Sequence, residues 1–313
     1  MKRVIIDTDA GVDDALAIIL ALKSPELKVE AITTVAGNVE VEKCTRNCFL
    51  LLDILEPAYS PIVAQGAKEP LVKDLVTAPE VHGEDGLGNV VAQYPTPGHK
   101  AVRDHVMFVI LDLIRKYPDS VTIVTIGPLT NLALAINKDI QTMRDVREII
   151  TMGGAFRVPG NTGPFAEFNM YVDPDAAQRV LDAGLPLTVL PLDVTEKVVL
   201  QWHEILGMRE KTKSRLGNFI AEFARAYMSY HQETAGFLGG YLHDPLAVGV
   251  AINKRFVRCR DLHVAVKTTG DSERGMTVAE PRRSQKKCRP NALVAQSVKS
   301  KEFLQFFQSR VWN

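Results

Sequence analysis

Short apolar runs alternate with helix-like segments along most of the chain, and this alternation constrains the fold more than any other feature. The runs contain few polar residues, which is typical of strands covered on both faces in a parallel sheet. We therefore expect an α/β fold in which helices flank both sides of a central, mostly parallel sheet of mixed type. The expected strands cover residues 4–7, 29–36, 121–126, 147–152, 187–192 and 262–266.

Helical patterns fill the intervals between these strands. Residues 174–182 carry the best signals, because Asp173 precedes Pro174 and Gly184 follows the last apolar turn. No low-complexity linker or internal repeat divides the chain, so residues 1–313 are predicted to form a single domain. The expected helices cover residues 13–23, 41–55, 102–117, 129–137, 174–182 and 213–230.

Charge and composition exclude several kinds of partner. Thirty-seven basic residues balance thirty-seven acidic ones, so neither nucleic acid nor an anionic membrane is a predicted partner. Apolar stretches are shorter than the roughly 20 residues that cross a bilayer, and no export signal is recognisable, so we expect a soluble, cytoplasmic protein. Four cysteines without a CxxC pair are read as free thiols, and zinc is not predicted: Cys44, Cys48, Cys259 and Cys288.

Four aspartates, Asp7, Asp9, Asp13 and Asp14, occur from the end of the first expected strand to the start of the first expected helix. A carboxylate at a helix N-terminus is ordinary capping, but three within six residues exceed what capping needs. Carboxylates this close repel one another unless a cation or separate hydration offsets their charge. The cluster therefore predicts a ligand site, with a metal ion as the ligand.

Other polar groups follow the expected strands, at the edge where loops of a parallel sheet converge. Several have an ordinary local explanation: Asn161 and Asn169 are turn formers, Asp244 before Pro245 is a helix cap, and His82 lies in a glycine-rich surface loop expected to be mobile. In such a loop a histidine titrating near neutrality could also contact a ligand. The basic segment 270–291, with Arg274, is read as a solvated loop or hairpin rather than a polyanion site.

Together these motifs resemble the inosine-uridine-preferring nucleoside hydrolases. The resemblance runs from residue 4 to about 252 and is carried by seven motifs in the same order, while the last sixty residues match weakly. It implies a Rossmann-like α/β fold with one bound calcium ion per subunit, and hydrolysis of ribonucleosides to base and ribose. The motifs are Asp7–Ala15, Val35–Asn38, His82-Gly83, Ile126–Asn131, Met152–Gly154, Ala166–Asn169 and His243–Pro245.

The resemblance assigns roles residue by residue. Calcium would be held by Asp9, Asp14, Asp244 and the main-chain carbonyl of Ile126, and Asp9 would also be the general base. His243 would protonate the leaving base. The remaining substrate contacts implied by the resemblance are Asp13, Asn38, Asn161, Glu167 and Asn169 for ribose hydroxyls, Met152 under the sugar, and His82 over the base.

Base preference is less well defined by the sequence. Purine-specific members stack the base between tryptophans, and here Trp202 and Trp312 lie outside every motif, so a pyrimidine, inosine or broad preference is expected. Tyr227, Tyr230 and His231 are candidates for base contacts. Members of this family are usually dimers or tetramers, which implies a homodimer or homotetramer here.

Two alternatives remain at the level of sequence. A magnesium-dependent phosphohydrolase of the haloacid dehalogenase type also begins with Asp-x-Asp, matched by Asp7-Thr8-Asp9, but Gly11 departs from its pattern. A non-catalytic ribose or nucleoside binder would keep the fold without turnover, although every matched catalytic position is present.

Overall fold

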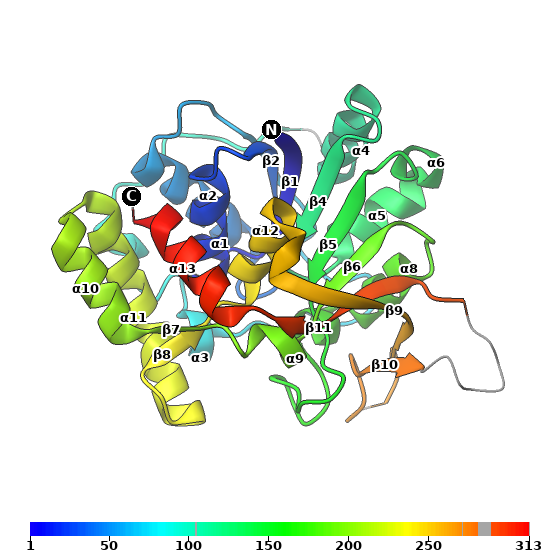
Figure 1. Cartoon of the computed structure of the whole chain (residues 1–313). Coiled ribbons are helices and arrows are strands. Elements are labelled where there is room, and N and C mark those ends of the chain that lie inside the picture. The colour runs from blue at the N-terminus through cyan, green and yellow to red at the C-terminus, as the bar shows by residue number, and fades with distance from the viewer. Residues whose placement is uncertain (104, 271, 281–288, 313) are drawn as a thin grey trace.

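The computed structural model describes residues 1–103, 105–270, 272–280 and 289–312. Within these residues, nine strands form one sheet in the order β10-β9-β11-β6-β5-β4-β1-β2-β3 (Figure 1). Seven of them, from β11 to β3, run parallel to one another, whereas β9 is antiparallel to both β11 and β10. The strands are β1 (Lys2–Thr8), β2 (Leu27–Thr34), β3 (Ile62–Gln65), β4 (Val121–Thr125), β5 (Glu148–Met152), β6 (Leu187–Leu190), β9 (Val257–Val266), β10 (Thr277–Glu280) and β11 (Ala292–Val298). The predicted mostly parallel, mixed sheet is confirmed.

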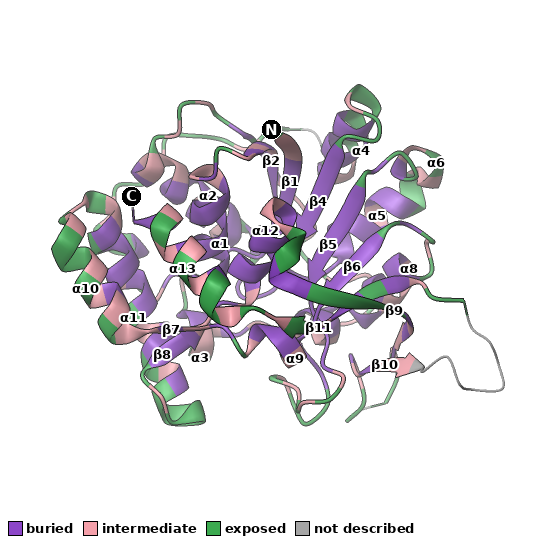
Figure 2. Cartoon of the chain, viewed as in Figure 1, coloured by how far each residue is buried: buried purple, intermediate pink, exposed green. Residues whose placement is uncertain are grey.

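Helices cover both faces of this sheet (Figure 1). Alternate residues of β1 show why: Val4 and Ile6 pack into one apolar cluster with α1, α2, α12 and α13, whereas Ile5 packs into a second with α4, α5 and α8. The strands between them are almost wholly buried (Figure 2). The helices are α1 (Val12–Leu22), α2 (Val41–Leu55), α3 (Pro79–His82), α4 (Val106–Lys116), α5 (Thr130–Lys138), α6 (Ile140–Met143), α7 (Phe168–Val172), α8 (Pro174–Leu181), α9 (Leu192–Thr195), α10 (Trp202–Thr212), α11 (Arg215–Ala235), α12 (His243–Ile252) and α13 (Ser300–Val311), with 3-10 turns at Val91–Gln93 and Lys254–Phe256.

A second, two-stranded sheet pairs β7 (Val199–Gln201) with β8 (Gly239–Tyr241) in antiparallel fashion. It lies beside the long helix α11, which contacts β8. This small sheet carries the chain from α11 back to α12, so the end of α11 and the start of α12 approach the same part of the molecule.

Most expected elements are present, and the departures have local causes. Every expected strand is found, and α2 has the expected bounds, but α4 begins four residues later than the expected residue 102, at Val106. The local alternative for Asp244, that it caps its helix, is excluded, because α12 begins at His243 and Leu242 occupies the N-cap position. The single-domain prediction for residues 1–313 stays a prediction.

The thiols and the basic segment are described in part. Cys44, Cys48 and Cys259 are free thiols, as predicted, while Cys288 lies outside the described residues. Of the basic segment, Arg274 and Arg289 are described, and residues 281–288 are not. None of the described helices combines the length and apolar content that a membrane crossing requires.

Candidate active site

Polar groups follow four adjacent parallel strands of the sheet, so they lie at the edge formed by the C-terminal ends of these strands. The order β5-β4-β1-β2 places the turn after β1, with Asp9, beside the segments that follow β2, β4 and β5. A cavity of about 400 Å³ opens at this edge. Its lining includes most of the predicted site residues: Asp13, Asn38, His82, Ile126, Met152, Asn161, Glu167, Asn169, His243 and Asp244.

The carboxylates form one buried cluster at this cavity. Ligand oxygens of Asp13, Asp14 and Asp244 lie within 4.8 Å of one another, although Asp244 comes from α12 and the other two from α1. This explains the position of Asp244 in its helix: its carboxylate faces Asp13 and Asp14 rather than capping the helix backbone. Asp9 is not one of these three residues, but its carboxylate interacts with that of Asp14, and both residues are fully buried.

Specific hydrogen bonds fix how these carboxylates are oriented. Asp14 accepts from Thr8 Oγ1 at 2.5 Å, from the Gly11 amide at 3.0 Å and from Asn38 Nδ2 at 3.0 Å. Asp9 Oδ2 accepts from the Asn38 amide at 2.8 Å, whereas its buried Oδ1 has no hydrogen-bond partner among the described residues. One oxygen of Asp9 is therefore held and the other is available.

The electrostatics of the cluster call for a cation. Burial raises the pKa of Asp13 to about 7, and burial followed by the charge of neighbouring aspartates raises the pKa of Asp9 and Asp244 well above the ordinary range. Among the described residues that line the cavity there is no Lys or Arg to offset these charges. Buried oxygen ligands, a carboxylate oxygen without a partner and an uncompensated negative charge together fit a divalent metal ion.

Two glycines make room for Asp9. A Cβ atom on Gly37 would lie 2.1 Å from Asp9 Oδ2, and one on Gly127 would lie 2.9 Å from Asp9 Oδ1. The backbones after β2 and β4 therefore approach Asp9 more closely than any side chain would permit. The glycines that follow these strands have this packing role beside the carboxylate.

The cavity wall also contains three further candidate sugar contacts, Glu167, Asn169 and Asn161. Glu167 is buried and accepts from the amides of Gly154, Asn169 and Met170 at 2.9 to 3.2 Å, and burial raises its pKa to about 7. Asn169 Nδ2 donates to the Ile126 carbonyl at 3.1 Å, which links this wall to a predicted metal ligand. Asn161 is exposed at the cavity and accepts from the Phe168 amide.

His82 differs from the expectation of a mobile loop with a near-neutral histidine. It is buried at the end of α3, its Nδ1 accepts from the Val12 amide at 3.0 Å, and its ring stacks on Tyr227 with 5.8 Å between centroids. Burial lowers its pKa to about 3. The expectation failed because both partners of His82 come from distant parts of the chain.

A cluster of rings also lines the cavity. Tyr227 and Tyr241 each lie edge-on to His231, with centroids 4.4 and 5.0 Å apart. His243 Nδ1 lies 2.7 Å from Thr195 Oγ1, and burial lowers the pKa of His243 to about 3. Sequence reasoning named Tyr227, Tyr230 and His231 but did not name Tyr241 and Glu196, which line the cavity, or Thr195, which contacts His243; none of these three occurs in a motif.

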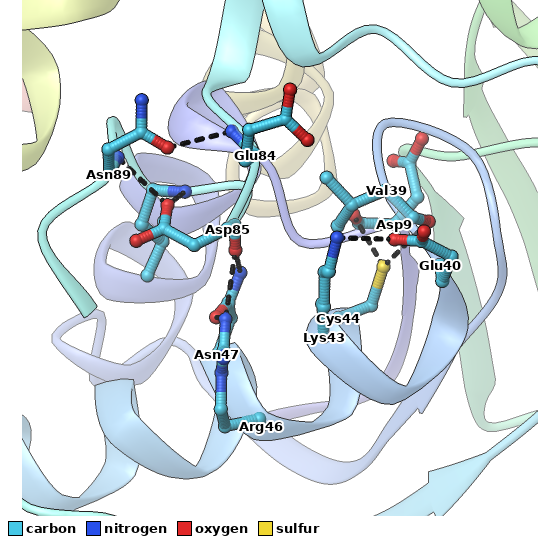
Figure 3. A network of polar contacts seen from close by, with 11 residues as sticks. Asp9, Val39, Glu40, Lys43, Cys44, Arg46, Asn47, Glu84, Asp85 and Asn89 are labelled. Carbon is cyan, nitrogen blue, oxygen red and sulfur yellow. Dashed lines mark hydrogen bonds and ion pairs between the residues drawn. The ribbon is translucent and has the colours of Figure 1, made fainter. Parts of the chain in front are cut away.

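Helix α2 supports the aspartate turn from behind (Figure 3). Cys44 Sγ donates to the Asp9 carbonyl at 2.9 Å, and Asn47 Nδ2 donates to the carbonyls of Ala10 at 3.1 Å and Asp85 at 2.8 Å. Ala10 has a φ of 39°, a left-handed conformation that is unfavourable for a residue with a side chain. These bonds hold the strained turn in place and connect it to the loop that follows His82.

Comparison with known proteins agrees with this geometry. The model of the inosine-uridine preferring nucleoside hydrolases matches residues 4–305, which extends the likeness beyond residue 252. The pyrimidine-specific ribonucleoside hydrolase RihA of Salmonella gallinarum is 37% identical over 309 residues, covering 98% of this chain and 97% of that protein.

Two solved structures match nearly the whole chain. A plant nucleoside hydrolase has a TM-score of 0.92 at 33% identity, with 99% of both chains covered. A purine-preferring ribonucleoside hydrolase from Gardnerella vaginalis has a TM-score of 0.92 at 34% identity, covering 99% of this chain and 98% of that one. The chain belongs to the inosine-uridine preferring nucleoside hydrolase family.

Proposed function

We propose that this ribonucleoside hydrolase is calcium-dependent and uses Asp9 as the general base for hydrolysis of the N-glycosidic bond. The observation that carries the proposal is that two chemically different kinds of group line one cavity. They are buried carboxylates, with no Lys or Arg among the described lining residues, and tyrosine and histidine rings. A ribonucleoside combines the matching parts, a hydroxyl-rich sugar and a flat aromatic base.

Calcium is proposed to bind Asp9, Asp14, Asp244 and the Ile126 carbonyl. This ligand set consists of oxygen atoms alone, which is the set that calcium prefers. Bound there, the ion would supply a Lewis acid for water and for ribose hydroxyls. The buried Oδ1 of Asp9 supports this assignment, because an unpaired buried carboxylate oxygen is costly unless a ligand meets it. Asp13 lies close enough to Asp14 and Asp244 to contact the same ligand.

Asp9 is proposed to accept the proton of the attacking water. The Asn38 amide holds Oδ2, so the carboxylate is oriented before substrate arrives, and as a ligand of the ion it would lie beside a water bound to the same ion. As the glycosidic bond breaks, the sugar gains positive charge, as in glycoside hydrolysis generally. The surrounding aspartates, including Asp13 and Asp14, would stabilise that charge by their proximity.

The ribose hydroxyls are proposed to bind Asp13, Asn38, Asn161, Glu167 and Asn169, with Met152 below the ring. Amides and carboxylates together can both donate to and accept from vicinal hydroxyls. A site that pairs hydroxyls in this way discriminates strongly against analogues that lack them, because its own buried groups would be left unpaired. Strict recognition of ribose is therefore expected.

The leaving base is proposed to receive a hydrogen bond from His243, with His82 and Tyr227 beside it. Thr195 Oγ1 occupies Nδ1 of His243, so Nε2 is the ring nitrogen left for substrate. Trp202 and Trp312 lie outside the described lining of the cavity, which supports a preference other than purine-only. The relatives differ, since one is named pyrimidine-specific and another purine-preferring, so we propose a broad preference that includes uridine and inosine.

The test is ribose release from a panel of uridine, cytidine, inosine, adenosine and guanosine. Protein treated with EDTA should be inactive and should recover with calcium; recovery with magnesium alone would contradict the proposed ion. Phosphate release from a monoester would point instead to the phosphohydrolase alternative, which the lack of Lys and Arg in the described cavity lining disfavours. Ribose binding without hydrolysis would indicate a non-catalytic binder.

Two further expectations stay predictions, a homodimer or homotetramer and a cytoplasmic location. Light scattering would measure the number of subunits.

A further inference from the structure

The β9–β10 hairpin contains residues 270 and 272–280 of the basic segment, and it contacts the chain around the candidate ribose contacts Glu167 and Asn169. Strand β10 is an edge strand of the large sheet, and residues 267–276 connect it to β9 (Figure 1). Met276 forms an isolated bridge with Ala166, the residue before Glu167. The hairpin therefore lies against the two segments that carry the candidate ribose contacts, one following β5 and the other entering α7.

Arg274 donates hydrogen bonds to main-chain carbonyls at the C-terminal end of α7. Its Nε donates to the Tyr171 carbonyl at 2.9 Å, a terminal nitrogen donates to the Val172 carbonyl at 3.0 Å, and its guanidinium lies 4.5 Å from the centroid of the Tyr171 ring. The last carbonyls of a helix lack partners within the helix, and a cation there also complements the helix dipole. Helix α7 has five residues, too few to be stable by itself, so external bonds of this kind decide where it sits.

Thr277 binds the segment that follows β5. Its hydroxyl accepts from the Ala155 amide at 2.9 Å and donates to the Ala155 carbonyl at 2.8 Å. The neighbouring Gly154 amide donates to Glu167 at 3.0 Å. The hairpin is therefore connected to Glu167 from two directions. Arg274 binds the end of α7, the helix that Glu167 caps, and Thr277 binds Ala155, the residue after Gly154, whose amide donates to Glu167.

We propose that Arg274 and Thr277 are positioning residues, which hold the side chains of Glu167 and Asn169 where they can bind the ribose hydroxyls. Neither side chain belongs to the described cavity lining, so both act through the segments that they brace. The inference rests on the proposed function, because it assumes that Glu167 and Asn169 bind the sugar. Misplacement of such contacts by even 1 Å lowers rates substantially.

The consequence is a change in sugar selectivity rather than a uniform loss. If Glu167 and Asn169 move, the enzyme loses the energy that it gains from particular hydroxyls, and an analogue without the affected hydroxyl has less to lose. Each change alone, the substitution or removal of that hydroxyl, should lower kcat/KM. Made together, the two changes should lower kcat/KM by less than the product of the two separate factors. A brace that acts only on stability would reduce the melting temperature and leave selectivity unchanged.

The test compares Arg274→Met and Thr277→Val with the wild type on inosine and its 2′-, 3′- and 5′-deoxy analogues. Methionine keeps the contact with the Tyr171 ring and removes the N–H donors, while valine keeps the shape of threonine and removes its hydroxyl. We expect kcat/KM for inosine to fall roughly 10- to 100-fold, with a clearly smaller fall for at least one deoxy analogue. Arg274→Lys, which keeps a donor, should recover part of the loss.

The matched control is Arg260→Met, a change to an exposed arginine of the same hairpin on β9. It should leave all four kcat/KM values unchanged. Equal losses on every substrate, or no loss in either variant, would overturn the inference, and thermal melts identify any loss that comes from unfolding. A wild-type enzyme that leaves all nucleosides intact would instead refute the proposed function, so the two failures are distinguishable.

Discussion

Binding of calcium should stabilise the fold, because it offsets repulsion within the buried aspartate cluster. Two unit charges 4.8 Å apart repel by about 3.5 kcal/mol at an effective dielectric constant of about 20. Calcium present at 100 times its dissociation constant should add about 2.7 kcal/mol to the free energy of unfolding. For 313 residues, an unfolding entropy of about 2.1 cal/mol/K per residue converts this to a melting temperature about 4 °C higher.

The assay is a thermal melt, followed by calorimetry or fluorescence, of EDTA-treated protein titrated with calcium chloride. Asp244→Asn removes one proposed ligand, so most of the shift should disappear. Asp173→Asn is the matched control, since Asp173 is equally a buried aspartate but binds Thr130 and two backbone amides away from the cluster. It should lower the starting melting temperature and keep the calcium shift. A wild-type shift near zero, or a full shift in Asp244→Asn, would refute the reasoning.

Three further substitutions test separate parts of the site. Asp9→Asn should lower kcat by roughly 100- to 10,000-fold in steady-state assays while the protein stays folded, since it removes the proposed base; activity near wild type would exclude that role. Gly37→Ala should reduce activity and melting temperature because the new Cβ would lie 2.1 Å from Asp9 Oδ2, whereas Gly98→Ala, with open space around it, should be neutral in both measurements. Glu167 has a folded-state pKa of about 7 against an ordinary 4.5, so its contribution to stability is full below about pH 4.5 and is lost as the pH rises to about 7. Glu167→Gln should therefore show a shallower fall in melting temperature across that range than either wild type or Glu148→Gln, and parallel curves would contradict this.

The sheet was predictable because burial on both faces leaves a continuous apolar run. The 121–126 and 147–152 runs correspond to β4 and β5 within a residue or two. Strand β3 was missed because it has four residues, Ile62–Gln65, and its first residue is exposed. Strand β8, with two glycines in its three residues, has no strand signal in its sequence, and it forms where β7 pairs with it.

The site was predictable where residue type alone limits the chemistry. Asp13 and Asn38 occur in short motifs after strands, and the topology brings them to one cavity. Local signals failed where remote partners decide the outcome. Asp244 precedes a proline and looks like a cap, yet its carboxylate meets aspartates from the other end of the chain. His82 looks like a loop residue, yet its position depends on the Val12 amide and the Tyr227 ring.

The central claim, that Asp9 with calcium hydrolyses ribonucleosides, is tested most directly by measuring free ribose after incubation with uridine or inosine. Calcium-replete wild-type protein should release ribose and base in equal amounts. EDTA-treated wild-type protein and Asp9→Asn should release neither ribose nor base above background. Added calcium should restore the activity of the EDTA-treated wild type but not that of Asp9→Asn. Ribose release that persists in EDTA or in Asp9→Asn, or its absence from calcium-replete wild-type protein, would contradict the account.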